Sequence, residues 1–419
     1  MQIEKHTLDN GLTVLLKESR HAPVTTFWVW YRVGSRNEVP GITGISHYVE
    51  HMLFKGSETF PKDQVHKEIA RNGGVRNAYT WLDFTTFFET LPADRIDLGL
   101  RIEADRMVNA LFDPQEAARE RTVIISERQG AENRPTFLLS EEVGSAAFRV
   151  HPYHHETIGD MCDLERISRE QLWHHYQAYY GPSNTIAVAV GDFDAAEMQA
   201  RIEDLFGPIP SRSSPPAVNR PEPPQRGERR VDLEGPDSTA HLQVAYHGPA
   251  AQDPDFFPMV ILSSILTGAT GMNLFAAGPP NRTSRLYKAL VEEGLAASVS
   301  GSVSPMIDPY LYNVTATVRA GRTLDEVEEA LDSEMERILA EPISEEELQT
   351  AIKQSKAQFA YSSESVTNQG FWVGYASIVA DTAWFEGFLD SLAAVTVEDV
   401  TRVADTYLRK QNRTVGRYI

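Results

Sequence analysis

The segment GISHYVEHMLF, residues 44 to 54, places two histidines and a glutamate within five residues. In a helix, His47 and His51 lie one turn apart, so both imidazoles can reach one metal ion. Glu50 lies beside them and can contact the same ion or its water. An apolar stripe on roughly the opposite side is formed by Ile45, Val49, Met52 and Leu53. The alternative is an ordinary solvated polar face, which would favour lysine, arginine and glutamate over the rarer histidine.

Two histidines do not bind zinc tightly, and a catalytic zinc has a third protein ligand and an open position for water. Glu120 and Glu127, in EAARERTVIISERQG, are seven residues apart, so they share a helix face. They are either plain surface or a carboxylate ligand with a second carboxylate that supports the site. From their spacing alone, both interpretations stay open.

Three segments follow one another along the chain: HYVEH, NAYT at residues 77–80, and ERTVIISE at residues 120–127. They resemble the pitrilysin and mitochondrial processing peptidase family, whose zinc motif is H-x-x-E-H in place of H-E-x-x-H. The spacing of 76 positions from His51 to Glu127 is similar to that family's distance to its third ligand. Further segments that resemble it are TLDNGLTVLL, VGSRNE, HMLFKGSETFP and FDPQEAARER, and the likeness spans the whole chain.

The resemblance implies a zinc metallopeptidase that uses Zn²⁺ to hydrolyse peptides, with the ligands His47, His51 and Glu127. It implies that Glu50 is the general base and that Glu120 orients a histidine ligand. Asn77 and Ala78 correspond to a pair that contacts the substrate, and a peptide would lie there as an added strand. The alternative for Asn77 is a turn residue after RNGG.

One segment of the second half departs from the family pattern. The family carries an arginine and a tyrosine there, seven residues apart, which bind substrate and could stabilise an oxyanion. In SRLYKALVEEGLAASVSG those places hold Val291 and Ala297, with one residue missing between them. Glu292 and Glu293 have the wrong charge for an oxyanion.

The resemblance therefore implies the catalytic subunit of a heterodimer. A homologous subunit without zinc ligands would supply the arginine and tyrosine, and the two would close a chamber that admits unfolded peptides. A homodimer or a monomer with other donors is the alternative. Two other functions remain: a non-catalytic structural or assembly subunit with the same fold, and a maturase that trims one dedicated peptide.

The order of expected helices and strands around these residues predicts an α+β fold. The Pro-rich segment GPIPSRSSPPAVNRPEPPQRGE predicts a linker between two halves with a similar order of elements. We expect a zinc-binding domain at 1–208, the linker at 209–228, and a homologous domain without zinc at 229–419. Each is expected to be a mostly antiparallel sheet backed by helices. The start of the chain predicts a strand, a turn at DNG and a second strand, and Trp28, Trp30 and Tyr31 predict sheet core.

Composition limits the partners. The formal net charge of -20 argues against nucleic acid or an anionic membrane surface as the main partner. No apolar run reaches the roughly 18 residues that span a bilayer. The single cysteine, Cys162, favours the cytoplasm, with the periplasm as the alternative if a leader was removed. His174 and His175 are predicted on a helix surface, and the histidines of HPYHHE, residues 151–156, in a loop.

Overall fold

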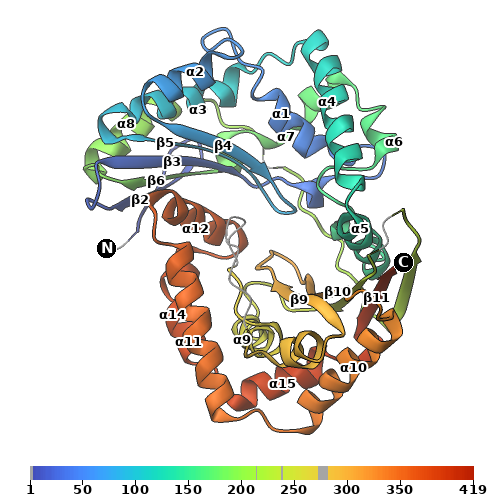
Figure 1. Ribbon diagram of the computed structural model, residues 1–419. Helices are drawn as coiled ribbons and strands as arrows, with labels where there is room; N and C mark the ends of the chain where they lie inside the picture. Colours follow the sequence, from blue (N-terminus) through green and yellow to red (C-terminus); the bar gives the residue numbers. More distant parts are fainter. Residues whose placement is uncertain (1–2, 214, 237–238, 272–281) are drawn as a thin grey trace. The chain divides into compact units, whose positions relative to one another are not determined.

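The protein forms two compact units in the computed structural model, which describes residues 3–213, 215–236, 239–271 and 282–419. Each unit contains one sheet and the helices that pack on it (Figure 1). The first unit comprises Met1–Gly130, His155–Asn219 and Ser363–Thr382. The second comprises Ala131–His154, Arg220–Ser362 and Ala383–Ile419.

The sheet of the first unit has six strands in the order β1-β2-β6-β3-β5-β4. The pair β2/β6 is parallel and the other neighbours are antiparallel. Strand β4 ends this order, so one of its edges has no partner strand among the described residues. The bounds are β1 Glu4–Thr7, β2 Thr13–Glu18, β3 Val24–Tyr31, β4 Val75–Thr80, β5 Thr85–Pro92 and β6 Thr185–Gly191.

Helices cover both faces of this sheet. Helices α1, α3 and α8 pack on one face, and α12 packs on β3 and β6 from the other (Figure 1). The bounds are α1 Ile45–Met52, α2 Gln64–Arg71, α3 Asp97–Asn109, α4 Pro114–Glu132, α6 Met161–Leu164, α7 Arg169–Tyr179, α8 Ala195–Phe206 and α12 Val366–Val379.

Helix α12 packs closely because it presents glycine to the largest side chains of β3. Trp28 and Trp30 are fully buried, and a Cβ at Gly370 or Gly374 would overlap their indole nitrogens. Glycines four residues apart therefore make a groove on one side of the helix that fits the two indoles. The burial of Trp28, Trp30 and Tyr31 confirms the predicted sheet core.

The second unit repeats this architecture. Its five strands are ordered β7-β11-β8-β10-β9, and β7/β11 is the parallel pair. Taken in chain order, they correspond to β2 through β6, with the parallel pair at the same place. The predicted α+β fold with two similar, mostly antiparallel sheets is confirmed. The strands are β7 Arg229–Leu233, β8 His241–His247, β9 Ala296–Val303, β10 Leu311–Val318 and β11 Arg413–Tyr418.

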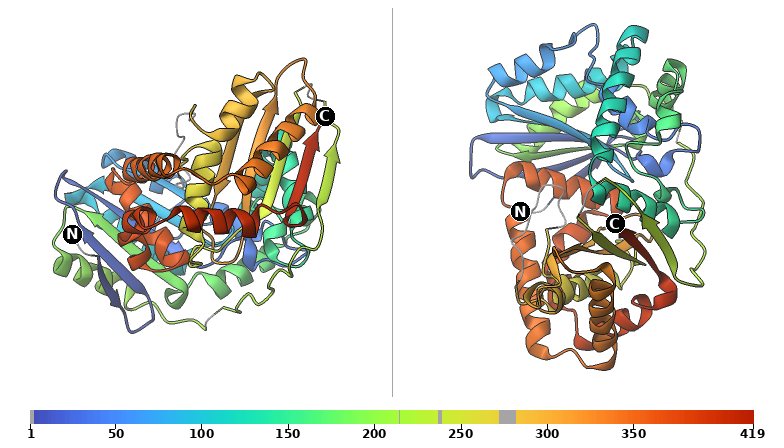
Figure 2. Two further views of the ribbon diagram at one scale, coloured as in Figure 1. Left: turned by 90° about the horizontal axis from the view of Figure 1, so that it is seen from below. Right: turned by 45° about the vertical axis from the view of Figure 1, so that its right-hand side comes forward.

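One helix of the early sequence belongs to the second unit. Leu139 and Val143 of α5 face Gly416 of β11, and Arg229 donates hydrogen bonds to the last carbonyls of α5. The second unit's helices are α5 Pro135–Ala147, α9 Phe256–Thr267, α10 Leu324–Ala340, α11 Glu345–Ser362, α13 Thr382–Glu386, α14 Phe388–Ala393 and α15 Val397–Tyr407 (Figure 2).

The boundaries drawn from the sequence, 1–208 and 229–419, follow chain order and stay a prediction. Packing groups α5 with later residues and α12 with earlier ones. Residue 214 of the predicted linker lies outside the described residues. None of the described helices has the length and apolar content needed to cross a membrane.

Several local predictions can be compared directly with the structure. Strands β1 and β2 pair across a turn in which Gly11 donates to Leu8, as DNG predicted. The predicted surface position of His174 is confirmed, but that of His175 is wrong. His175 is buried against α1, and its Nε2 lies 3.1 Å from Ser46 Oγ.

Candidate metal centre

Helix α1 is held at its N-terminus by a buried carboxylate. Glu38 accepts hydrogen bonds from the backbone N–H groups of Gly44 and Ser46, both at 2.8 Å. A carboxylate suits this place because the first N–H groups of a helix lack partners within it and carry partial positive charge. Glu38 also contacts His155, whose Nε2 lies 3.0 Å from its Oε2. Gly44 has a φ of 85°, which favours glycine.

The two histidines of α1 meet a carboxylate from α4. The ring centroids of His47 and His51 are 4.5 Å apart and their planes are inclined by 70°. The Nε2 atoms of His47 and His51 lie 3.9 Å and 3.7 Å from Glu127 Oε2. Among the described residues, these three form the only group of histidine, cysteine or carboxylate side chains close enough to share an ion.

This donor set fits zinc. Zinc takes histidine nitrogen and carboxylate oxygen at about 2.0–2.2 Å, so two ligands of one ion lie at most about 4 Å apart. Burial lowers the pKa of His47 to about 3, and the neighbouring His51 adds to the effect, so this imidazole is neutral, as a ligand must be. Glu127 exposes 50% of its side chain, which leaves one side of the group accessible.

Glu120, two turns before Glu127 on α4, supports His51 from behind. Its Oε1 lies 2.9 Å from His51 Nδ1, and its other oxygen forms an ion pair with Lys55. Burial raises the pKa of Glu120, but the hydrogen bonds from His51 and Lys55 outweigh it and hold the pKa below its ordinary value. An ionised carboxylate on Nδ1 directs the lone pair of Nε2 toward a metal and makes the imidazole a stronger ligand.

Glu50 is buried, with 8% of its surface exposed. Thr80 Oγ1, at the end of β4, donates a 2.7 Å hydrogen bond to its Oε2. Burial raises the pKa of Glu50, and the bond from Thr80 only partly offsets the shift. The sequence grouped Glu50 with the histidines on a polar face; α1 instead carries it toward the edge strand of the sheet.

Asn77 and Ala78 lie on this edge strand and face opposite ways. Ala78 is 7% exposed and points to the side of α1, whereas Asn77 is exposed and its Nδ2 donates to Tyr79 Oη at 2.8 Å. Both belong to β4 and pair with β5, so Asn77 is a strand residue and the turn alternative is wrong.

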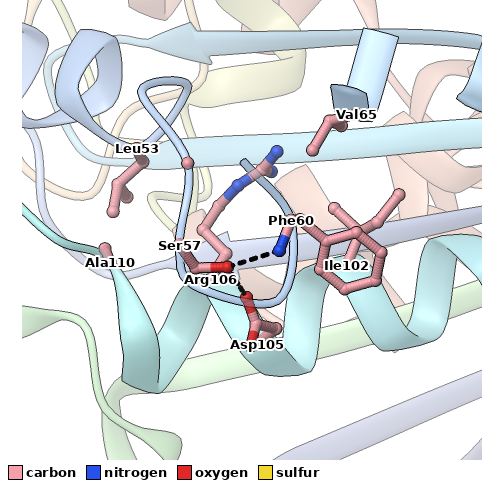
Figure 3. A pocket seen from close by; sticks show the side chains of 9 residues that line it. Leu53, Ser57, Phe60, Val65, Ile102, Asp105, Arg106 and Ala110 are labelled. Atoms are coloured by element: carbon pink, nitrogen blue, oxygen red, sulfur yellow. Dashed lines mark hydrogen bonds between the residues drawn. The ribbon is translucent and has the colours of Figure 1, made fainter. Parts of the chain in front are cut away.

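The segment that follows α1 is joined to α3 by a hydrogen bond, and only a small cavity lies between the two (Figure 3). Ser57 Oγ hydrogen-bonds to Asp105 and accepts from the backbone N–H of Phe60 at 2.9 Å. The cavity beside them has a volume of about 20 Å³. That is room for about one water molecule, so this cavity does not receive a peptide side chain.

Two family descriptions match the chain in succession. "Insulinase (Peptidase family M16)" matches residues 13–161, which include the whole histidine and glutamate group, and "Peptidase M16 inactive domain" matches residues 166–355. The chain belongs to the M16 family of zinc peptidases.

Relatives match this M16 peptidase over nearly its whole length. It is 27% identical over 403 residues to mitochondrial-processing peptidase subunit beta of Blastocladiella emersonii, covering 96% of this chain and 85% of that protein. It is 27% identical over 425 residues to zinc protease PqqE of Helicobacter pylori, covering 98% and 91%. The crystal structure of a protease from Helicobacter pylori superposes with a TM-score of 0.93 at 25% identity, covering 100% and 99%.

The M16 assignment confirms the predicted class of enzyme, a zinc metallopeptidase, and its cofactor. The role of each residue stays a prediction. Sequence reasoning did not assign functions to Lys55, Thr80 and Glu38, which contact Glu120, Glu50 and the start of α1. Thr80 closes the NAYT segment and Lys55 lies one turn after His51, so spacing carried a signal for both.

The segment of the second half that departs from the family pattern spans a helix and a strand. Val291 lies in the helix Tyr287–Glu292 (η5), and Ala297 lies in β9. Neither side chain can donate a hydrogen bond to an oxyanion.

Proposed function

We propose that this chain hydrolyses peptide bonds of unfolded peptides, with His47, His51 and Glu127 as zinc ligands and Glu50 as the proton-transfer group. The observation that carries the proposal is the convergence of two imidazoles and a carboxylate beside a buried glutamate. When bound, zinc supplies Lewis-acid activation of water and of the peptide carbonyl. Glu50 accepts a proton from the attacking water and gives it to the leaving amine as the C–N bond breaks.

Glu120 acts through His51 by holding its Nδ1–H, and Lys55 acts through Glu120. The substrate binds as an extended strand along the open edge of β4, where Asn77 and Ala78 lie. Support for this mode comes from the edge position of β4 and from the bond that joins its last residue, Thr80, to Glu50. Main-chain pairing with β4 requires an extended substrate backbone, which favours unfolded peptides over folded proteins.

We further propose that this chain is the catalytic subunit of a heterodimer that closes a chamber around its substrates. Val291 and Ala297 stand where an arginine and a tyrosine are expected, so a homologous subunit would supply both donors. A relative of this chain is named as a subunit, the beta subunit of a mitochondrial processing peptidase. A homodimer is the alternative, and full peptidase activity of the purified chain alone would rule out the heterodimer. We also propose a cytoplasmic location, which the single, free Cys162 favours, and cell fractionation tests it.

The test of the catalytic proposal is hydrolysis of a quenched fluorescent peptide by the zinc-loaded chain, alone and with a candidate partner encoded by the same organism. Turnover that needs both zinc and the His47, His51 and Glu127 side chains supports the proposal. Stoichiometric zinc without turnover under any of these conditions would favour the structural or assembly role.

A further inference from the structure

Strand β4 presents an arginine on the same face as the catalytic contacts. Arg76, Ala78 and Thr80 alternate with Val75 and Asn77, which are exposed on the other side. Because Thr80 donates to Glu50, the face that holds Arg76 is the face toward the candidate metal centre. Its cation therefore lies on the edge strand along which we propose that the peptide binds.

Among the described residues, no carboxylate lies within ion-pair distance of the Arg76 guanidinium, although Glu89 and Glu103 act on it from further away. Its carbon lies 4.6 Å from the ring centroid of Phe54, just beyond the end of α1, and its Nε is buried without a hydrogen bond. The backbone of Arg76 pairs with Glu89 in the sheet, but no hydrogen bond or ion pair within 4 Å joins its guanidinium to another described residue. Arg106 contacts the same ring at 5.1 Å, but Arg106 forms an ion pair with Glu103. A half-buried cation without a carboxylate partner favours binding of an external anion.

Two buried carboxyl groups lie near this guanidinium but do not form an ion pair with it. Glu89 lies opposite Arg76 in the sheet and is buried together with Glu103. Burial and the neighbouring Glu103 raise the pKa of Glu89 well above its ordinary value, although Arg106 and Arg76 act in the opposite direction. Glu103 forms an ion pair with Arg106, so neither of these two carboxyl groups forms an ion pair with Arg76.

We propose that Arg76 is a specificity-determining residue that binds a carboxylate of the peptide substrate, either an acidic side chain or the C-terminal carboxylate. The proposal rests on the proposed peptidase function and adds its substrate class. Arg76 and Thr80 are four residues apart, which is about 13 Å along a strand. Side chains of an added strand also alternate. The preferred carboxylate therefore lies an even number of residues, two or four, from the peptide residue beside Thr80.

The test is kcat/KM on a peptide series in which aspartate is moved along an otherwise neutral sequence, with free and amidated C-termini. Aspartate at one position is expected to raise kcat/KM about tenfold or more over alanine or lysine there. A preference that follows the internal aspartate assigns a side-chain subsite. A preference that disappears when the C-terminus is amidated shows that the C-terminal carboxylate is the group bound.

The variants are Arg76→Met, which keeps an unbranched apolar stem over Phe54, and Arg76→Lys, which keeps the charge. Arg76→Met should remove the preference by lowering kcat/KM on acidic peptides far more than on neutral ones, and Arg76→Lys should restore part of it. Arg71→Met is the matched control, because Arg71 is exposed and paired with Glu68 on α2. Melting temperature and zinc content identify variants that fail to fold.

An equal loss on acidic and neutral peptides in folded Arg76→Met, or no preference in the wild type, would overturn the role of Arg76. Either result leaves the peptidase proposal intact. Absence of hydrolysis of every peptide, with the partner present, counts instead against the proposed function.

Discussion

Replacing Lys55 by methionine should weaken zinc binding, although Lys55 contacts none of the proposed ligands. Its ammonium pairs with Glu120, and Glu120 holds Nδ1 of His51 at 2.9 Å. Lys55 and Glu120 expose 20% and 9% of their side chains, so water screens the pair only in part. Without the ammonium, Glu120 loses one of the two contacts that keep it ionised and fixed in orientation.

The magnitude follows from the position of Lys55 in this chain of contacts. A partner that directly orients a metal-binding histidine contributes about 10–100-fold in metal affinity. Lys55 is one contact further away, and a partly screened ion pair contributes about 1 kcal/mol. We therefore expect Lys55→Met to raise the zinc Kd about fivefold, Glu120→Gln to raise it about 10-fold or more, and Lys55→Arg to retain most of the wild-type affinity.

The chain provides a matched control one turn away on α4. Lys62 pairs with Glu116 at 2.6 Å, but Glu116 contacts no histidine and Lys62 exposes 43% of its side chain. Competition with a chromophoric chelator measures zinc affinity for Lys55→Met, Lys62→Met and the double variant Lys55→Met/Glu120→Gln. Lys62→Met should bind zinc like the wild type, and Lys55→Met should cost little once Glu120 is glutamine. Wild-type affinity in folded Lys55→Met, or an equal loss in Lys62→Met, would refute the reasoning.

Two further predictions concern stability. Gly374→Ala should lower the free energy of unfolding by about 1–3 kcal/mol because the new Cβ overlaps Trp30. Gly144→Ala, on α5, should be neutral or stabilising because a Cβ there meets no other atom. Urea titration compares the two variants, and equal effects would contradict the packing argument. Burial lowers the pKa of His175 to about 3. Below the unfolded-state pKa near 6.5, the unfolded chain therefore binds a proton that the folded chain does not, and the free energy of unfolding decreases as the pH is lowered. Between pH 7.5 and 5.5, His175 should lower the free energy of unfolding by about 1 kcal/mol. In metal-free His175→Gln this contribution to the pH dependence should be absent. A pH dependence equal to that of the wild type would count against a neutral buried His175.

Local spacing predicted the elements well where the signal lay within a few residues. The one-turn separation of His47 and His51 and the apolar stripe through Val49 specify a helix, and α1 confirms it. The sheet that a helix covers depends on contacts distant in the chain. The sequences of α5 and α12 do not reveal that α5 packs on β11 and α12 on β3.

The candidate site shows the same division. Periodicity places Glu120 and Glu127 on one face of α4, but only the fold brings Glu127 to the histidines and Glu120 to Nδ1 of His51. His175 was expected at the surface because neighbouring polar residues on a helix are usually solvated. It is buried because α7 packs against α1, where Ser46 provides a partner.

The most direct test of the central claim compares wild type, Glu50→Gln and Glu120→Gln for zinc content and peptide hydrolysis on the same samples, alone and with a partner subunit. We predict full zinc content in wild type and Glu50→Gln, with turnover lost in Glu50→Gln because the proton-transfer group is gone. Weakened zinc binding is expected in Glu120→Gln. Turnover of Glu50→Gln at the wild-type rate, or a wild-type chain that binds no zinc, would contradict the account.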